Sequence, residues 1–314
     1  MKERYRELCN EESSIPLFSQ AWWLDAVAGD SWDVILEMKG DQIIGALPYV
    51  VQKKLGIKFI SQPKLTQSLG PWIRPTQKSY SKQLSYEKDV LNALNDNLPA
   101  CDEYRQNWYC GITNWLPFYW NGYEQTTRYT YRLDLTVDKD LLWKGLQQNI
   151  RGDIRKAQER FRITVRKGTI QEFIELNRLT FERQGRSAPY TKELVDNINI
   201  AALKRNACDC LIAEDEEGRL HAGAYIVRSC DTAYYLMGGG DPELRNSGAT
   251  SLVLWEAICR QPEEIEIFDF EGSMIEPIER FFRAFGAVQA PYYHVSKTFS
   301  KFLRFARFWK GLIK

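Results

Sequence analysis

The residues best suited to chemistry lie in the segment from residue 264 to residue 293. Asp269 and Glu271 stand at the end of a short run of Ile and Phe residues, a pattern typical of a buried strand. Gly272 then breaks the strand, and a helix is predicted to follow. Two carboxylates at the mouth of a buried strand are costly unless they are paired, solvated or used in a reaction. Either they take part in chemistry, or they accept hydrogen bonds from nearby backbone N–H groups.

A second candidate site is a glycine-bearing loop that leads into a helix. A strand that ends in three glycines is followed by Arg245, Ser247 and Gly248, and a helix is predicted from about Ala249, with Thr250 in its first turn. Such a loop presents backbone N–H groups and the positive end of the helix dipole to an anion. The pattern predicts a pyrophosphate-binding loop or an ordinary helix cap.

Two further segments offer binding residues. Residues 138–161 are predicted to form one or two helices with Arg151 and Arg155 on one side, which is either a solvated face or a phosphate-binding surface. Residues 108–131 are rich in aromatic side chains, including Tyr129 and Tyr131 at or just before the end. So many aromatic side chains predict either a hydrophobic core between the domains or a platform that binds a sugar or another ring-bearing ligand.

These candidate sites need a scaffold larger than one domain. A chain of 314 residues predicts two domains, each with its own core. The strand, acidic turn and strand around residues 210–227 repeat the pattern of residues 34–51, and three glycines match at an offset of 178 residues: Gly40 and Gly218, Gly45 and Gly223, Gly70 and Gly248. This register indicates a duplicated domain. We expect domains at residues 1–137 and 138–296, followed by a basic amphipathic helix at residues 297–314.

Composition and charge narrow the class of protein. The chain has no long uncharged apolar run and its first residues lack a signal-peptide core, so we expect a cytoplasmic protein. Seven cysteines without framework spacing fit reduced thiols, and two histidines give no basis for a histidine-rich metal site. Basic residues gather in residues 144–167 and 280–314, which suggests a localised anionic partner. The terminal helix would then lie on an anionic membrane or dock on its own domain.

Several motifs resemble known families. Arg245-Asn-Ser-Gly-Ala-Thr250 is similar to the Arg/Gln-x-x-Gly-x-Gly/Ala loop with which GNAT acyltransferases hold coenzyme A. FDFEGS and FFRAFG, together with NIRGDIRKA and RYTYRLDL, resemble the signature of the Fem family. Those proteins consist of tandem GNAT-like domains and are aminoacyltransferases that build the cross-bridges of peptidoglycan. The Phe281-Phe282 pair, with Arg283 next, stands where that family has a Phe-Lys pair.

The resemblance implies an α/β fold with mixed sheets and two tandem GNAT-like domains with a cleft between them. It implies an acyltransferase that moves an acyl or aminoacyl group onto an amine of a cell-envelope precursor or amino sugar. Asp269 or Glu271 would act as base, Tyr235 or its neighbour Tyr234 would protonate the leaving group, and Arg283 would neutralise charge. The alternative is a catalytically inactive tandem GNAT-like domain that binds a glycan or scaffolds an envelope complex.

The co-substrates also follow from the resemblance. The donor would be acyl-CoA or aminoacyl-tRNA, with no covalently bound cofactor, and the acceptor a small or lipid-linked amine. A peripheral contact with the inner face of the membrane would suit a lipid-linked acceptor. The residues expected to bind the donor are Arg245, Ser247, Gly248, Ala249 and Thr250, and those expected to bind the acceptor are Arg151, Arg155, Tyr129 and Tyr131.

Overall fold

The computed structural model describes residues 1–272 and 274–305, and the chain divides into two compact units. Unit 1 comprises Met1–Arg128 and the chain from Pro291 onward, and unit 2 comprises Tyr129–Ala290. The strands β6 (Glu124–Asp134) and β12 (Val288–Thr298) each pass from one unit into the other. The expected domains at 1–137 and 138–296 follow chain order and differ from these units. The pattern of a single strand gives no sign that its two ends belong to different units.

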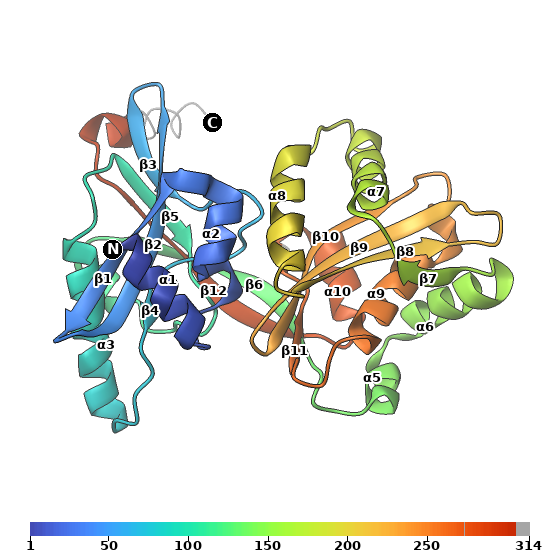
Figure 1. Cartoon of the computed structure of the whole chain (residues 1–314), viewed down its shortest axis with the longest axis horizontal. Coiled ribbons are helices and arrows are strands. Elements are labelled where there is room, and N and C mark those ends of the chain that lie inside the picture. Colours follow the sequence, from blue (N-terminus) through green and yellow to red (C-terminus); the bar gives the residue numbers. More distant parts are fainter. Residues whose placement is uncertain (273, 306–314) are drawn as a thin grey trace. The chain divides into compact units, whose positions relative to one another are not determined.

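Unit 1 is a sheet with helices on both faces. Its strands lie in the order β1 (Trp32–Lys39), β2 (Gln42–Lys54), β3 (Ile57–Ser61), β5 (Glu103–Asn107) and β12, with β4 (Trp72–Ile73) paired to β2. β3 and β5 are parallel, whereas β1 with β2, β2 with β3 and β5 with β12 are antiparallel. Helices α1 (Lys2–Glu11) and α2 (Ala21–Ala28) pack on one face, and α3 (Tyr80–Asp96) and α4 (Leu116–Trp120) on the other (Figure 1).

The aromatic stretch of residues 108–131 mostly builds the core of its units. Trp108, Phe118 and Tyr123 are buried together in unit 1, where Phe118 contacts both other rings edge-on. Burying large rings of this kind contributes much of the hydrophobic stabilisation of a core. Tyr119 and Trp120 remain exposed on α4.

Unit 2 has the same layered plan. Its strands follow the order β6, β11 (Ile267–Asp269), β10 (Thr232–Gly240), β9 (Leu220–Ser229), β8 (Cys208–Glu214) and β7 (Thr164–Lys167). β10 and β11 are parallel and all other neighbours in this unit are antiparallel.

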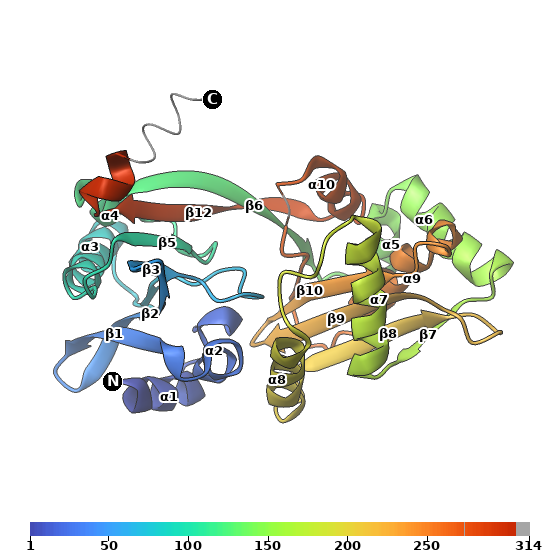
Figure 2. The same ribbon diagram turned by 90° about the horizontal axis from the view of Figure 1, so that it is seen from above.

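Helices cover both faces of the unit 2 sheet. One face carries α7 (Ile170–Arg183) and α8 (Lys192–Leu203), and the opposite face carries α5 (Lys139–Gly145), α6 (Gln148–Arg155), α9 (Ala249–Cys259) and α10 (Glu276–Arg283) (Figures 1 and 2). Helix α7 begins at a capping box in which Thr169 and Glu172 satisfy each other's backbone N–H groups. On the opposite face, residues 138–161 form the two helices α5 and α6, and α6 continues into a short π-helix at Lys156–Arg160.

The two units repeat one topology. The order β1, β2, β3, β5, β12 in unit 1 corresponds to β8, β9, β10, β11, β6 in unit 2, with one parallel pair at the same place in each. The matched glycines also share backbone conformation, with φ of 86° at Gly70 and 85° at Gly248. The duplication that the glycine register predicted is confirmed by these strand orders and dihedral angles.

The C-terminal segment differs in part from the expected helix at residues 297–314. Lys297 and Thr298 belong to β12, and residues 301–305 are helical, with Phe302 and Phe305 exposed. The remainder of the expected helix, residues 306–314, lies outside the described residues. No helix in the described part of the chain is long and apolar enough to span a membrane.

Candidate active site

The parallel strands β10 and β11 of unit 2 pair only over a short stretch and then part. Thr232–Tyr234 lie opposite Ile267–Asp269, after which β11 ends while β10 continues to Gly240. The backbone N–H of Phe270 donates instead to the carbonyl oxygen of Tyr131 on β6, at 2.9 Å. The sheet therefore opens beside Tyr234 and Asp269.

Asp269 lies at this opening and holds the turn that follows. Its carboxylate, 5% exposed, accepts hydrogen bonds from the Thr130 hydroxyl at 2.5 Å and from the backbone N–H of Glu271 at 2.8 Å. The Arg132 guanidinium lies 3.7 Å from it. Burial raises the pKa of Asp269, and these three partners offset only part of that rise.

Glu271 adopts an uncommon backbone conformation in the same turn. Its φ is 57°, in the left-handed region that residues with a Cβ seldom occupy. Gly272 is also left-handed, and a Cβ there would overlap the carbonyl oxygen of Tyr129, so the turn packs closely against β6. Burial raises the pKa of Glu271 well above its ordinary value, and the neighbouring Asp269 carboxylate adds to this effect. A carboxyl with a raised pKa is a stronger base once it ionises.

Asp269, one of the two candidate bases, and Tyr235, the predicted acid, lie on opposite faces of the sheet. Phe268 and Phe270 flank Asp269 and both pack in the core with Phe282 of α10. Because successive side chains of a strand alternate, Asp269 projects toward the face that carries α7. The ring of Tyr235 meets that of Phe282 edge-on, with centroids 6.0 Å apart, and so lies on the α10 face.

Tyr235 is placed by the glycines that end β10. A Cβ at Gly238 would overlap the Tyr235 hydroxyl, so the glycine leaves room for that group. Burial raises the pKa of Tyr235, with a further contribution from Tyr190, and the phenol therefore keeps its proton at neutral pH. Its neighbour Tyr234 is buried, 6% exposed.

Arg283 and Tyr131 meet through a residue that the sequence did not single out. Glu279 on α10 accepts a hydrogen bond from Arg283 Nε at 2.8 Å and another from the Tyr131 hydroxyl at 2.7 Å. Gln289 in turn donates to the Tyr131 hydroxyl at 2.8 Å. The Arg283 and Tyr131 bonds lower the pKa of Glu279 and keep it ionised. Tyr129, two residues earlier on β6, lies on the same face as Tyr131.

The predicted donor loop divides into an exposed half and a buried half. Arg245 and Thr250 are exposed, whereas Ser247, Gly248 and Ala249 are buried. A Cβ at Gly248 would overlap the carbonyl oxygen of Asp153, so the loop lies directly against α6. The Ser247 hydroxyl accepts a hydrogen bond at 3.3 Å from the N–H of Ala249, the first residue of α9.

A buried histidine that sequence reasoning missed holds this loop in place. His221 Nδ1 lies 3.0 Å from the Ser247 hydroxyl, and His221 Nε2 lies 2.9 Å from Asp215 Oδ2. The three residues follow the order of a Ser-His-Asp triad, but all are buried, which shields the hydroxyl from a substrate. Burial favours the neutral acid, yet hydrogen bonds from His221 and Arg219 hold the pKa of Asp215 below its usual range. The sequence did contain one sign of this cluster, which is a single histidine, His221, within an apolar strand.

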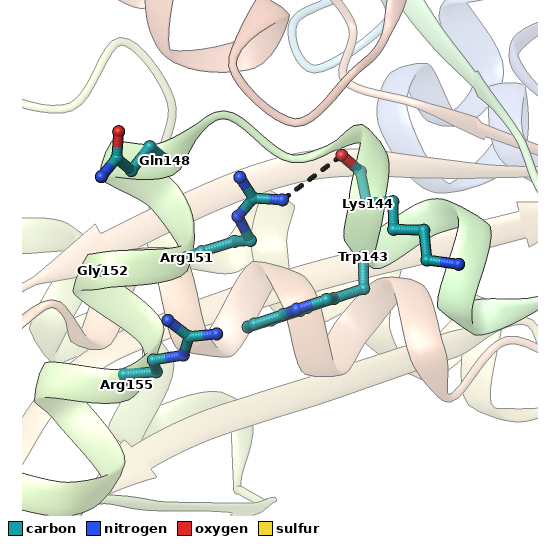
Figure 3. Close-up of a pocket in the computed structure, with 6 residues that line it drawn as sticks. All are labelled: Trp143, Lys144, Gln148, Arg151, Gly152 and Arg155. Carbon is teal, nitrogen blue, oxygen red and sulfur yellow. Dashed lines mark hydrogen bonds between the residues drawn. The ribbon is translucent and has the colours of Figure 1, made fainter.

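The residues expected to bind the acceptor fall in two places. Arg151 and Arg155 project from α6 toward Trp143 on α5 and line a pocket of about 540 Å³ (Figure 3). Tyr131, by contrast, belongs to the Glu279 network. Among the residues that the structure describes, no cluster of three or more His, Cys, Asp and Glu side chains is arranged to hold a metal ion.

Comparisons with known proteins agree with this geometry. Residues 144–277, within unit 2, match the family model described as an acetyltransferase (GNAT) domain. A sequence comparison with curated proteins found no match. Similar solved structures cover nearly all of both chains: FemX (TM-score 0.69, 14% identity, 93% of this chain and 95% of that chain), the C-terminal domain of a putative lysylphosphatidylglycerol synthetase from Agrobacterium fabrum (0.56, 10%, 94% and 92%), and a tandem GNAT protein from the clavulanic acid biosynthesis pathway (0.53, 10%, 94% and 92%).

The fold and the domain match together define a tandem GNAT-fold acyltransferase. Its architecture is Fem-like, as the motifs in the sequence indicated, and it is similar to FemX along nearly the whole chain. A GNAT domain implies an acyl donor, of which acyl-CoA is the usual form, and an amine acceptor.

Proposed function

We propose that this protein is an N-acyltransferase that moves an acyl or aminoacyl group onto an amine of a cell-envelope precursor or amino sugar. The observation that carries the proposal is the parting of β10 and β11 beside Asp269 and Glu271. Beyond Tyr234 β11 no longer pairs with β10, and an extended acyl donor would lie along this edge of β10 in place of a strand, next to the Gly238 carbonyl and Gly240 N–H that Asn177 and Thr180 of α7 bind. Backbone N–H groups on this edge would also stabilise the oxyanion that forms when the acyl carbonyl is attacked.

The two faces of the sheet suit the two halves of the reaction. The acceptor amine would approach on the face of Asp269, attack the acyl carbonyl and lose its proton to a carboxylate. The new C–N bond replaces the bond to the leaving group, which takes a proton from Tyr235 on the α10 face. Because burial raises the pKa of Glu271 well above its ordinary value and its φ is 57°, we assign the base to Glu271, and we assign the positioning of the turn to Asp269, which accepts hydrogen bonds from Thr130 and the Glu271 N–H.

The acceptor class rests on similarity and on charge. FemX and the putative lysylphosphatidylglycerol synthetase share the fold, and the second is named for an aminoacylated lipid. The Arg283, Glu279 and Tyr131 network beside the opening offers a cation and hydrogen-bonding groups for a polar acceptor. An envelope precursor would be met in the cytoplasm or at the inner face of the membrane.

Binding measurements test whether the acyl donor is a thioester or an aminoacyl-tRNA. We take it to be an acyl thioester, because the family model that matches unit 2 is an acetyltransferase domain and Arg245 and Thr250 remain exposed for phosphates. Acyl-CoA should raise the melting temperature of the purified protein, and Arg245→Glu should abolish that rise while Arg186→Glu, at an exposed site on another loop, should not. Co-purifying RNA, seen as excess absorbance at 260 nm, with no stabilisation by acyl-CoA would assign the donor to aminoacyl-tRNA instead.

A further inference from the structure

The pocket between α5 and α6 has the size and lining of a ligand site. Its volume of about 540 Å³ falls within the range of roughly 300–1,000 Å³ that small-molecule sites occupy. Figure 3 shows Arg151 and Arg155 on successive turns of α6, with the Trp143 ring of α5 below the Arg151 guanidinium and beside that of Arg155. The lining residues include two arginines and a lysine, whose side chain extends away from the arginines in Figure 3, and no acidic residue: they are Trp143, Lys144, Gln148, Arg151, Gly152 and Arg155.

The cations of this pocket lack acidic partners. Among the ion pairs of the described residues none involves Lys144, Arg151 or Arg155, whereas other arginines on the same unit, such as Arg178 and Arg260, pair with glutamates. The one protein hydrogen bond shown in the pocket runs from Arg151 Nη1 to the Lys144 carbonyl oxygen at 3.4 Å. Gathered cations repel one another, so an anion that entered the pocket would relieve this repulsion.

The indole of Trp143 gives the pocket a planar apolar wall. Its ring packs edge-on against Trp255 of α9, with centroids 5.2 Å apart, and this contact fixes its orientation. The Arg155 guanidinium lies 5.8 Å from the ring centroid, within reach of a cation–π contact. A fixed ring beside a guanidinium favours a ligand that itself has a planar ring next to its negative charge.

Gly152 keeps the floor of the pocket open. It lies inside α6 with an ordinary helical backbone, and in the described structure no other heavy atom comes within 4 Å of the place a Cβ would take. Glycine inside a helix costs about 0.5–1 kcal/mol relative to alanine, and neither the backbone nor the packing requires it here. An absent side chain at this point leaves room for a bound group.

From these observations we propose that the α5–α6 pocket binds a phosphate group attached to a planar ring, the chemistry of a nucleotide that forms part of a small-molecule substrate. The assignment to a substrate rests on the proposed function, whereas the binding itself does not. Helix α6 also touches the donor loop, since Asp153 lies against Gly248, and the Gln147 N–H donates to Ala284 at the end of α10 at 2.9 Å. A nucleotide held here would therefore lie on the element that adjoins the donor loop.

Calorimetric titration of the full chain with 3′,5′-ADP, UDP and inorganic phosphate tests the proposal. We expect at least one nucleotide to bind, and to bind at least tenfold more tightly than phosphate. Gly152→Glu should weaken that binding at least tenfold, because the new carboxylate enters the pocket and pairs with the arginines. Gly152→Ala is the matched control and should bind as the wild type does.

Preference for 3′,5′-ADP would assign the ring to the donor and preference for UDP to the acceptor, and both results support the site. The proposal is overturned if neither nucleotide binds, if phosphate binds as tightly as the tighter nucleotide, or if Gly152→Glu binds normally. An Arg151→Gln, Arg155→Gln double variant repeats the test should Gly152→Glu not fold. Glu271→Gln should bind the nucleotide unchanged, so loss of the proposed catalysis and loss of this site are separable.

Discussion

At the scale of single residues, Glu271 combines two features that each cost free energy. A left-handed non-glycine residue costs about 1–3 kcal/mol, and burial disfavours the charged form of its carboxyl. The surrounding turn enforces both, through the Asp269 hydrogen bond to the Glu271 N–H and the close packing of Gly272 on β6. Costs of this kind gather at functional sites, which is why the base is assigned to Glu271.

Glu271→Gln should make the protein more stable in alkaline solution but not in acid. The raised pKa means that folding favours the protonated form, so stability is full below the ordinary glutamate pKa of about 4.3 and is lost as pH rises through the folded pKa. Glutamine removes this loss. Melting temperatures should therefore exceed those of the wild type at pH 8 and match them near pH 4, whereas Glu263→Gln, at an exposed site, should show no such trend. If the difference in melting temperature between Glu271→Gln and the wild type were the same at pH 4 and pH 8, the Glu271 carboxyl would not be buried as described.

The carboxylates of this site could be predicted from the sequence, whereas its backbone conformation and its hydrogen bonds could not. A pair of carboxylates at a strand end is visible as a pattern, and Asp269 and Glu271 were found that way. The left-handed φ of Glu271 and the link from Glu279 to Tyr131 depend on contacts between residues far apart in the chain, which no local pattern encodes. The Asp215, His221 and Ser247 chain was missed for the same reason.

At the scale of elements, the glycine run that ends β10 is explained by packing. Gly238 leaves room for the Tyr235 hydroxyl, and a Cβ at Gly239 would stand 2.5 Å from the backbone nitrogen of Asn177 on α7. The Asn177 side chain also donates to the Gly238 carbonyl at 2.7 Å. Helix α7 therefore rests directly on the free end of β10 and fixes the strand at the point where the sheet opens.

Gly239→Ala should destabilise the protein, because the new methyl group forces α7 away from β10. Overpacking of this kind costs about 1–3 kcal/mol, which denaturant unfolding measures as a lower midpoint. Gly145→Ala is the control, since a Cβ there meets nothing within 4 Å in the described structure, and its stability should be unchanged or slightly higher. Equal midpoints for Gly239→Ala and the wild type would show that α7 does not press on β10.

Helices and strands could be predicted from the sequence where the spacing of apolar residues stayed the same along the whole element. The hairpin of β8 and β9 was expected from its pattern and is present, and the one or two helices expected over residues 138–161 are two, α5 and α6. The strands β6 and β12 each contribute to both units, and the expected boundaries at residues 137 and 296 follow chain order instead, because hydrophobic alternation is the same in both parts of such a strand.

At the scale of the whole molecule, the duplication is structural while the candidate chemistry belongs to unit 2. Strand β5, which is parallel to β3 in unit 1, ends in Gln106 and Asn107, whereas β11, which is parallel to β10 in unit 2, ends in Asp269. Gln106 is fully buried, and its amide accepts from Tyr104 and donates to Pro48. Amides cannot serve as general bases, and the acetyltransferase family model also matches within unit 2. Unit 1 thus keeps the fold, and its β5 has a buried carboxylate, Glu103, at the start of the strand but none at the strand end.

The central claim is acyl transfer to an amine at the opening between β10 and β11. It is tested most directly by incubating the purified full chain with radiolabelled acyl-CoA and a panel of amino sugars and amine-bearing envelope precursors, then measuring labelled amide. The account predicts that the wild type labels at least one acceptor and that Glu271→Gln does so about 10²-fold more slowly or worse, while Glu263→Gln keeps the wild-type rate. Labelling at the wild-type rate by a folded Asp269→Asn, Glu271→Gln double variant would contradict it.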